Sequence, residues 1–432
     1  MAEIDKFFRI LAETGGSDLH LSPEERPLIR LHGSLKEMEE GHPALSSAQI
    51  EALFEEIVPK VNKEEFAKDN DTDFAYEITG LARFRANIFR DRKGVGGVFR
   101  VIPSEILTAE ALNLSPAILQ LCYLTKGLVL VTGPTGSGKS TTLCAMIDYI
   151  NRNRDDHIIT IEDPIEFVHD NKRCLINQRE VGVHTNGFKR ALKAALREDP
   201  DIILVGEMRD LETIAIAIEM AETGHLVFGT LHTSTAPSTV DRIIDQFPAG
   251  QQNQIRTMLA ESLKGVVAQT LCRTADGKGR RAALEILLVN SAVGSNIRDG
   301  KTHQIPLAMT TGRKLGMVSL NDALIELVKS GTVAAGEAYA KAVDKGALER
   351  EFERLRISFT KPGSEVAKGG SKPARPAQAA KPRPSSIPAP AKPAGRAIGG
   401  GGRPQRPPGQ RPPAKAAAAP SGDKSKKRGW FS

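Results

Sequence analysis

Hydrophobic and polar positions follow two different patterns in the first 360 residues of the chain. Up to about residue 103, apolar and polar side chains alternate over three segments, as in half-buried strands, and two further segments have the spacing of short helices. We therefore predict a small α+β domain over residues 1–103. Its helices are expected at Ile4–Glu13 and Ser46–Ile57 and its strands at Asp73–Glu77, Ala82–Phe89 and Gly97–Val101.

Short, mostly apolar runs replace this alternation after a linker at residues 104–114. Such runs are typical of strands buried on both faces, and their alternation with helical stretches is typical of an α/β domain with a mostly parallel sheet. We predict such a domain over residues 115–357. None of the runs approaches the ~20 apolar residues that a membrane span needs. The strands are expected at Leu128–Thr132, Ile158–Ile161, Ile202–Val205, Leu226–Leu231 and Leu284–Val289.

Composition changes after residue 357. Residues 361–432 hold 14 of the 26 prolines, 11 of the 39 glycines, and 16 Lys and Arg against two acidic residues. So little apolar surface cannot offset the entropy of ordering, and residues 358–432 are predicted to form a disordered basic tail. The net charge of +7 thus divides into +14 for residues 361–432 and −7 for the remainder, which argues against a nucleic-acid partner.

The N-terminal residues and the cysteines bear on the compartment. The first residues, Met1–Lys6, lack the basic start and apolar middle of a secretory signal, so we expect a cytoplasmic protein. The four cysteines are scattered without a C-x-x-C pair, which predicts neither a disulfide framework nor a cysteine-only zinc site.

The strongest chemical signal is a glycine-rich segment that matches G-x-x-x-x-G-K-[ST], directly after the apolar strand Leu128–Thr132 and before a predicted helix at Thr141–Tyr149. Glycines let backbone N–H groups face phosphates, Lys139 can reach the β and γ phosphates, and Ser140 can bind Mg²⁺. The segment therefore predicts a nucleotide site, and by itself it does not distinguish an ATPase from a GTPase, a kinase or a helicase. Its residues are Gly133, Pro134, Thr135, Gly136, Ser137, Gly138, Lys139, Ser140 and Thr141.

Acidic residues follow two later strands. Glu162, Asp163 and Glu166 come after Ile158–Ile161, at the sheet edge where the glycine-rich segment also opens, and Glu207 follows Ile202–Val205. A carboxylate in the position of Glu207 suits Mg²⁺ coordination through a bound water. A solvated charged loop is the alternative for either cluster.

Two histidines bracket the strand at Leu226–Leu231. His225 and His232 suggest a sensor of the γ-phosphate and a relay to a neighbouring subunit, whereas a lone histidine there would more often be structural. Their spacing, with no cysteine nearby, does not make a closed zinc site.

These segments together resemble the type IV pilus retraction ATPases, the PilT or twitching-motility family of secretion-type ATPases. The resemblance covers residues 1 to about 357. The chain lacks the four-cysteine element of pilus extension and type II secretion ATPases. The matching segments are Ser17–Leu21, Ala82–Arg90, the glycine-rich P-loop, Thr160–His169 as the aspartate box, Asp199–Asp210 as Walker B, and Ala221–Thr233 as the histidine box.

The resemblance implies an ATP- and Mg²⁺-dependent homohexameric motor, with an N-terminal PAS-like domain on a RecA-like P-loop domain. By the same resemblance Glu166 is the general base, Glu207 holds Mg²⁺ through water, and Arg85 and Arg100 close over the phosphates. Arginines from a second domain also suit this task chemically, because they can neutralise charge on the transferred phosphoryl group. Arg83 lies beside them in the sequence.

The implied partners are the chain itself, an inner-membrane platform protein of the pilus, other pilus ATPases and, through the basic tail, an anionic membrane surface. The location would be cytoplasmic and peripheral to the inner membrane. Two other functions stay open, an accessory paralogue that acts mainly by binding and a DNA-translocating, conjugation-type ATPase.

Overall fold

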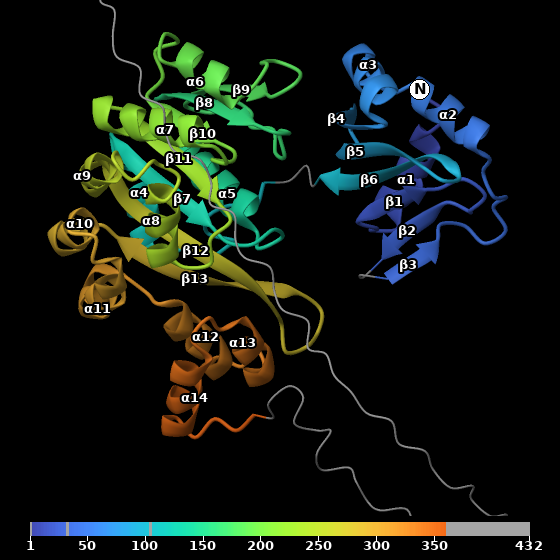
Figure 1. Ribbon diagram of the computed structural model, residues 1–432. Coiled ribbons are helices and arrows are strands. Elements are labelled where there is room, and N and C mark those ends of the chain that lie inside the picture. Colours follow the sequence, from blue (N-terminus) through green and yellow to red (C-terminus); the bar gives the residue numbers. More distant parts are fainter. Residues whose placement is uncertain (1, 32–33, 103–105, 360–432) are drawn as a thin grey trace, which may run out of the picture. The chain divides into compact units, whose positions relative to one another are not determined.

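Two separate β-sheets organise the structure (Figure 1). The computed structural model describes residues 2–31, 34–102 and 106–359. Both sheets belong to the same compact unit of the chain. The basic tail predicted from the sequence lies outside the described residues.

The N-terminal sheet has six antiparallel strands in the order β3-β2-β1-β6-β5-β4. Its core includes Phe8, Phe84 and Phe99, and the rings of Phe8 and Phe84 stack with their centroids 4.3 Å apart. Both helices and all three strands expected here are present. The elements are α1 (Asp5–Glu13), β1 (Asp18–Leu21), β2 (Leu28–Leu31), β3 (Ser34–Glu37), α2 (Ser47–Glu55), α3 (Lys60–Asp69), β4 (Asp71–Ile78), β5 (Ala82–Asp91) and β6 (Gly94–Ile102).

The second sheet has seven strands in the order β13-β12-β7-β11-β10-β8-β9, all parallel except for the antiparallel edge strand β13. Every residue of the central strands β7, β10 and β11 is buried, as their apolar runs predict. The sequence pattern did not indicate β9 or β12. The strands are β7 (Gly127–Thr132), β8 (His157–Glu162), β9 (Leu175–Glu180), β10 (Ile202–Val205), β11 (Leu226–Leu231), β12 (Leu263–Arg273) and β13 (Arg280–Leu288).

Helices cover both faces of this sheet. Helices α4 and α5 pack on one face, α6 to α11 on the other, and α12 to α14 form a cluster against β12 and β13. The helices are α4 (Pro116–Leu121), α5 (Lys139–Asn153), α6 (Phe188–Ala195), α7 (Leu211–Thr223), α8 (Ala236–Ile244), α9 (Gln252–Ser262), α10 (Ser291–Arg298), α11 (Ile305–Thr311), α12 (Leu320–Lys329), α13 (Ala335–Lys341) and α14 (Lys345–Arg354), with 3-10 turns at Thr302–Gln304 and Gly312–Leu315.

The parallel pairing decides where function can lie. Because β7, β8, β10 and β11 run in the same direction, the loops that follow them meet at one edge of the sheet.

No helix in the described residues is both long and apolar enough to cross a bilayer. All four cysteines are buried and free of disulfide bonds.

Candidate nucleotide site

The P-loop joins β7 to α5 through a turn that depends on glycine. Gly133 has φ 146°, and a Cβ there would lie 2.3 Å from the backbone oxygen of Gln269, so a larger residue would clash with main chain. Gly138, with φ 89°, is the N-cap of α5. These two glycines turn the chain sharply, and the free N–H groups at the start of α5 are left facing outward to receive an anion.

Lys139 lies inside this turn. Its Nζ donates to the backbone oxygens of Gly133, at 2.9 Å, and of Pro134, at 3.4 Å. Burial lowers the pKa of Lys139, although the charges of Glu207 and Glu166 act in the opposite direction. The buried amide of Gln269 braces the loop from β12 by donating to the backbone oxygen of Ser137 at 2.7 Å.

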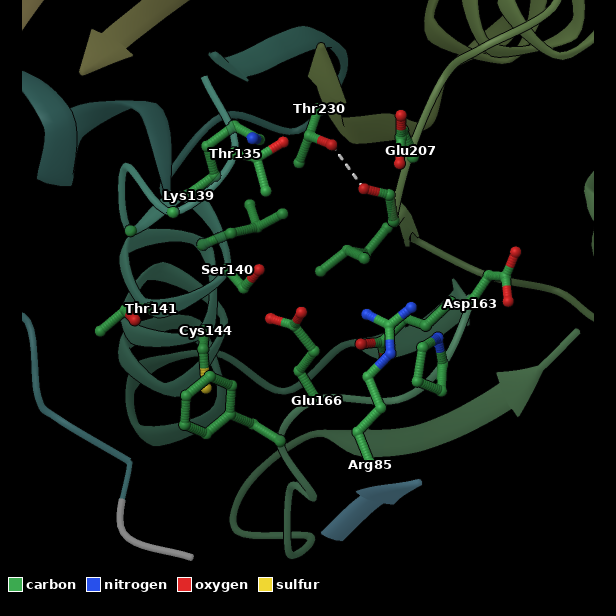
Figure 2. A pocket seen from close by; sticks show the side chains of 18 of the residues that line it. Arg85, Thr135, Lys139, Ser140, Thr141, Cys144, Asp163, Glu166, Glu207 and Thr230 are labelled. Atoms are coloured by element: carbon green, nitrogen blue, oxygen red, sulfur yellow. Dashed lines mark hydrogen bonds between the residues drawn. The ribbon is translucent and has the colours of Figure 1, made fainter. Parts of the chain in front are cut away.

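A cavity of about 590 Å³ opens in front of the P-loop (Figure 2). It brings together P-loop residues, both acidic clusters, one histidine of the histidine box and two arginines of the N-terminal sheet. The predicted residues that line it are Thr135, Gly136, Gly138, Lys139, Ser140, Thr141, Glu162, Asp163, Glu166, Glu207, His232, Arg85 and Arg100.

Four predicted residues do not line the cavity. Gly133 and Ser137 are buried at the base of the P-loop, whereas Pro134 is exposed. His225 lies immediately before β11, at the opposite end of that strand from His232, and its Nδ1 is 3.1 Å from the backbone oxygen of Met220. His225 therefore lies away from the cavity of its own chain, which is at the carboxyl end of the strand, and its role at a nucleotide stays a prediction.

Glu207 is fixed and ionised. One carboxylate oxygen lies 2.7 Å from Nη2 of Arg209 and the other lies 2.8 Å from Nε2 of His232. Burial alone would raise the pKa of Glu207, but the hydrogen bond and charge of Arg209, together with His232, outweigh burial and lower it. A charged carboxylate therefore stays available in the cavity at neutral pH.

The two glutamates of the aspartate box differ in their surroundings. The Glu162 carboxylate accepts from the Thr160 hydroxyl at 2.6 Å and from the Gln178 side-chain amide at 3.1 Å. Burial raises its pKa despite these bonds. The carboxylate of Glu166 instead points into the cavity toward Ser140 (Figure 2). Glu166 is thus placed to act on a bound molecule, while Glu162 mainly braces its neighbours.

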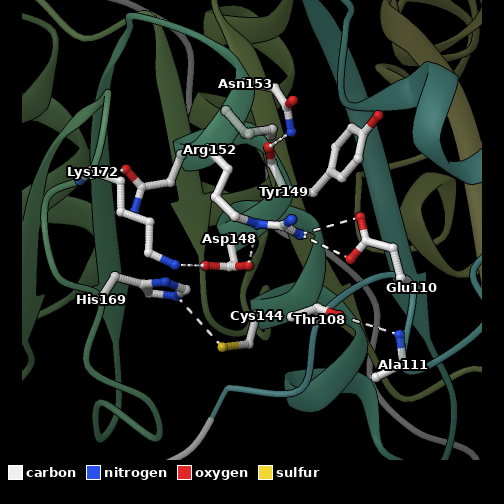
Figure 3. Close-up of polar contacts among 12 residues, drawn as sticks. Thr108, Glu110, Ala111, Cys144, Asp148, Tyr149, Arg152, Asn153, His169 and Lys172 are labelled. Carbon is white, nitrogen blue, oxygen red and sulfur yellow. Dashed lines mark hydrogen bonds and ion pairs between the residues drawn. The ribbon is translucent and has the colours of Figure 1, made fainter.

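The chain beyond Glu166 is tied to α5 (Figure 3). The Asp148 carboxylate, 2% exposed, accepts from Lys172 Nζ at 2.5 Å and from Arg152 Nε at 2.9 Å. One turn further along, the buried Asn151 donates to the backbone oxygen of Asp170 and accepts from the backbone N–H of Lys172. The helix that begins with Lys139 therefore also anchors the loop that carries Glu166.

The N-terminal arginines have different partners. Arg100 donates to Asp18 at 2.8 Å, and Arg85 lies 3.9 Å from Asp73. Burial works against ionisation of Asp18, but hydrogen bonds from Ser17 and Arg100 lower its pKa. Arg83 does not line the cavity and instead pairs with the buried Glu180 of β9 at 2.8 Å.

Comparisons with known proteins identify the family and several relatives of this chain. Residues 3–315 match the family described as type II/IV secretion system protein. The chain belongs to this family. It is 49% identical over 340 residues to the type IV pilus retraction ATPase PilT of Pseudomonas aeruginosa, covering 79% of this chain and 98% of the relative. It is also 49% identical over 317 residues to a twitching motility protein of Neisseria gonorrhoeae, covering 73% of this chain and 84% of the relative.

A solved relative extends the likeness to structure. The crystal structure of the pilus retraction motor PilT with bound ADP matches with a TM-score of 0.75 and 42% identity, covering 81% of this chain and 99% of that one. The expected membership among the secretion ATPases is confirmed. The chain is accordingly a nucleotide-binding, ATP-hydrolysing enzyme of the secretion ATPase family with an α/β fold.

A second cavity, not predicted from the sequence, adjoins the first in this secretion ATPase. It shares Gly138, Thr141, Leu271 and Arg280 with the phosphate-facing cavity. Its remaining wall is largely apolar and comes from the segment after the N-terminal sheet and from β13, with Leu107, Leu112, Leu114, Ala282 and Leu284. Four of these residues are leucines and one is alanine, and none belongs to a motif, so only the folded chain reveals that they converge beside the P-loop.

Proposed function

We propose that this secretion ATPase is a motor that couples ATP hydrolysis to the retraction of type IV pili. The observation that carries the proposal is one cavity that joins the P-loop, the carboxylates of Glu166 and Glu207, and arginines of the other sheet. The names of the relatives, a pilus retraction ATPase and a twitching motility protein, support the assignment to pili.

ATP binds with its triphosphate on the P-loop. Backbone N–H groups of the loop and of the first turn of α5 face the phosphates, and Lys139 reaches the β and γ phosphates. Arg85 and Arg100 neutralise charge on the transferred phosphoryl group from the other side of the cavity. The adenine and ribose occupy the adjoining apolar cavity, where Leu112 and Leu271 offer apolar contact.

Glu166 is the general base. Its carboxylate points to the space in front of Ser140, so it can take the proton of a water that attacks the γ-phosphate (Figure 2). His232 hydrogen-bonds to Glu207 and connects that carboxylate to the histidine box. Through this bond His232 is suited to report the state of the γ-phosphate.

The donors present fit Mg²⁺. The Ser140 hydroxyl and the ionised Glu207 carboxylate both line the cavity, and oxygen atoms are the ligands that Mg²⁺ prefers. In the described part of the chain no three His, Cys, Asp or Glu side chains converge to make a closed cage, which suits an ion held chiefly by phosphates and water. Bound there, the ion would neutralise charge on the β and γ oxygens.

The motor works as a homohexameric ring. Residues 1–103 form a PAS-like domain and residues 115–357 a RecA-like domain, and closure of one on the other around ATP supplies the movement. The ring delivers this movement to a platform protein in the inner membrane, at which the otherwise cytoplasmic motor is peripherally held. Other pilus ATPases are further candidate partners.

A complementation experiment tests the function. The wild-type chain should restore surface motility and normal pilus number to a strain that lacks its own copy, whereas Lys139→Ala should leave cells non-motile and hyperpiliated. Lys301→Ala, which changes an exposed lysine on a turn, is the matched control. Bald cells in the deletion strain would indicate a motor of pilus extension, and ATP turnover stimulated by DNA would indicate a translocase.

A further inference from the structure

The loop that carries Glu166 is held from the edge strand β9. Successive side chains of a strand point to opposite faces, so Gln178 and Glu180 share one face and Asn177 and Arg179 share the other. Gln178 hydrogen-bonds to the backbone that follows Glu166, and Glu180 hydrogen-bonds to the backbone that precedes it. Neither residue belongs to a motif used above.

Gln178 holds the chain that follows Glu166. Its Oε1 accepts from the backbone N–H of His169 at 2.8 Å, and its Nε2 donates to the backbone oxygen of Phe167 at 2.8 Å. The same Nε2 donates to the Glu162 carboxylate at 3.1 Å. One side chain thus pairs with the loop backbone in both directions, as a neighbouring strand would.

Glu180 holds the residue that precedes Glu166. Its Oε2 accepts from the backbone N–H of Ile165 at 3.1 Å and from Arg83 Nη2 at 2.8 Å. The side chain is 5% exposed, so the positive charge of Arg83 compensates a buried carboxylate. The two β9 side chains therefore fix the backbone at residues 165, 167 and 169, with Glu166 between them.

We propose that Gln178 and Glu180 are positioning residues that set the place of the Glu166 carboxylate in the cavity. The proposal rests on the role of Glu166 as general base given above. A base must lie within about 3 Å of the proton it takes, and a shift of about 1 Å can lower turnover by about 10²-fold. The ladder of β9 with β8 uses main-chain atoms, so the sheet does not need these side chains to form.

Steady-state kinetics of the full-length protein test the proposal. Gln178→Met keeps the length of the side chain and removes its hydrogen bonds, and it should lower kcat by about 10- to 100-fold. The KM for ATP and the affinity for ADP should stay within about twofold, since the P-loop is untouched. Asn177→Met, on the exposed opposite face of the same strand, is the matched control and should keep wild-type kinetics.

Glu180 supplies a second, independent pair of variants. In Glu180→Gln a carbonyl oxygen can still accept from the backbone of Ile165, so kcat should fall less than in Glu180→Met. If Gln178→Met fails to fold, this pair carries the test alone. If any of these variants loses ADP affinity by as large a factor as it loses kcat, and its melting temperature also falls, the residue is structural. That result would overturn the proposal.

Combination with Glu166→Gln separates this proposal from the role of Glu166. If Gln178 acts through Glu166, adding Gln178→Met to Glu166→Gln should cause little further loss of kcat. A full multiplicative loss in the double variant would refute the positioning role while leaving Glu166 as the base. Wild-type turnover in Glu166→Gln would instead refute the base assignment itself.

Discussion

The two sides of the nucleotide cavity are built in different ways. The P-loop takes its shape mainly from its own residues, through the left-handed glycines Gly133 and Gly138 and the hydrogen bond of Lys139 to the backbone of Gly133, with Gln269 as one support from outside. The loop with Glu166 takes its shape from side chains elsewhere, with Gln178 on β9 and Asp148 on α5 among them.

This difference predicts which step each side controls. A main-chain cradle forms together with β7 and α5, so it presents its N–H groups to phosphate whenever the domain is folded. A loop held by side chains depends on each of those bonds, and single substitutions can move it without unfolding the sheet. We therefore expect changes on the P-loop side to alter binding and changes on the other side to alter turnover.

The largest expected effects come from one variant on each side of the cavity, which separate nucleotide binding from turnover. Lys139→Ala should abolish productive nucleotide binding, because it removes the positive charge of the P-loop that reaches the β and γ phosphates. Glu166→Gln should keep ATP bound and lower turnover by at least about 10²-fold, the scale for loss of a general base. Titration with a fluorescent ATP analogue and a phosphate-release assay measure the two quantities. Equal loss of binding in both variants would contradict the division.

The arginines add a third component to the cavity, which acts after binding. Arg85→Ala and Arg100→Ala should each lower kcat by about 10²-fold, as removal of one donor to the transition state does, with much smaller changes in ATP affinity. Turnover, nucleotide affinity and native mass measured on the same preparation decide the matter. A variant that fails only to assemble would show that its arginine has a structural role. Arg26→Ala, in an exposed ion pair with Glu37, is the control.

The same contrast explains what could be predicted from the sequence. The P-loop, the strand before it and the acidic segments after β8 and β10 follow from residue types at short, fixed spacing. The strands before these segments are parallel, so their carboxyl ends share one edge of the sheet. It follows that the cavity is lined by Glu166, Glu207 and His232. For His225 the same rule, applied to the direction of β11, puts the residue at the opposite end of that strand from this cavity.

The hydrogen bonds by which side chains hold these loops in place could not be predicted, because they join residues that are distant in the chain. Gln178 meets Glu162, and Gln269 meets Ser137, only once β9 and β12 have taken their places in the sheet. β9 itself was missed because it is an edge strand with polar residues in its second half, so it lacks the apolar run of the central strands.

A smaller effect should follow from loosening the far end of the Glu166 loop. Asp148→Ala removes the buried acceptor of Lys172 and Arg152 and should destabilise the protein by about 1.5 kcal/mol, because hydrogen bonds to charged groups are lost. Asp155→Ala breaks an exposed pair with Arg173 and is the control, with stability nearly unchanged. Urea unfolding of both variants measures the difference. Equal stability would show that Asp148 does not anchor the loop.

The smallest effect on hydrolysis is expected from the basic segment 361–432, which lies outside the described residues and carries a charge of +14. We expect its removal to leave ATP turnover and oligomer size nearly unchanged, because every residue assigned to the cavity precedes it. Removal should instead reduce sedimentation with anionic vesicles, since each basic residue near such a surface contributes about 1 kcal/mol of attraction.

Raising the salt concentration should mimic this truncation, because exposed charges are screened within about 8 Å at physiological ionic strength. Lys424–Arg428 and the adjoining Trp430 and Phe431 combine charge with aromatic residues suited to a membrane interface, so replacing the two aromatic residues by serine should weaken sedimentation at constant charge. If the full-length and truncated proteins sediment equally with anionic vesicles at low salt, the segment is not a membrane contact, and the membrane location proposed above would then have to depend on residues 1–360.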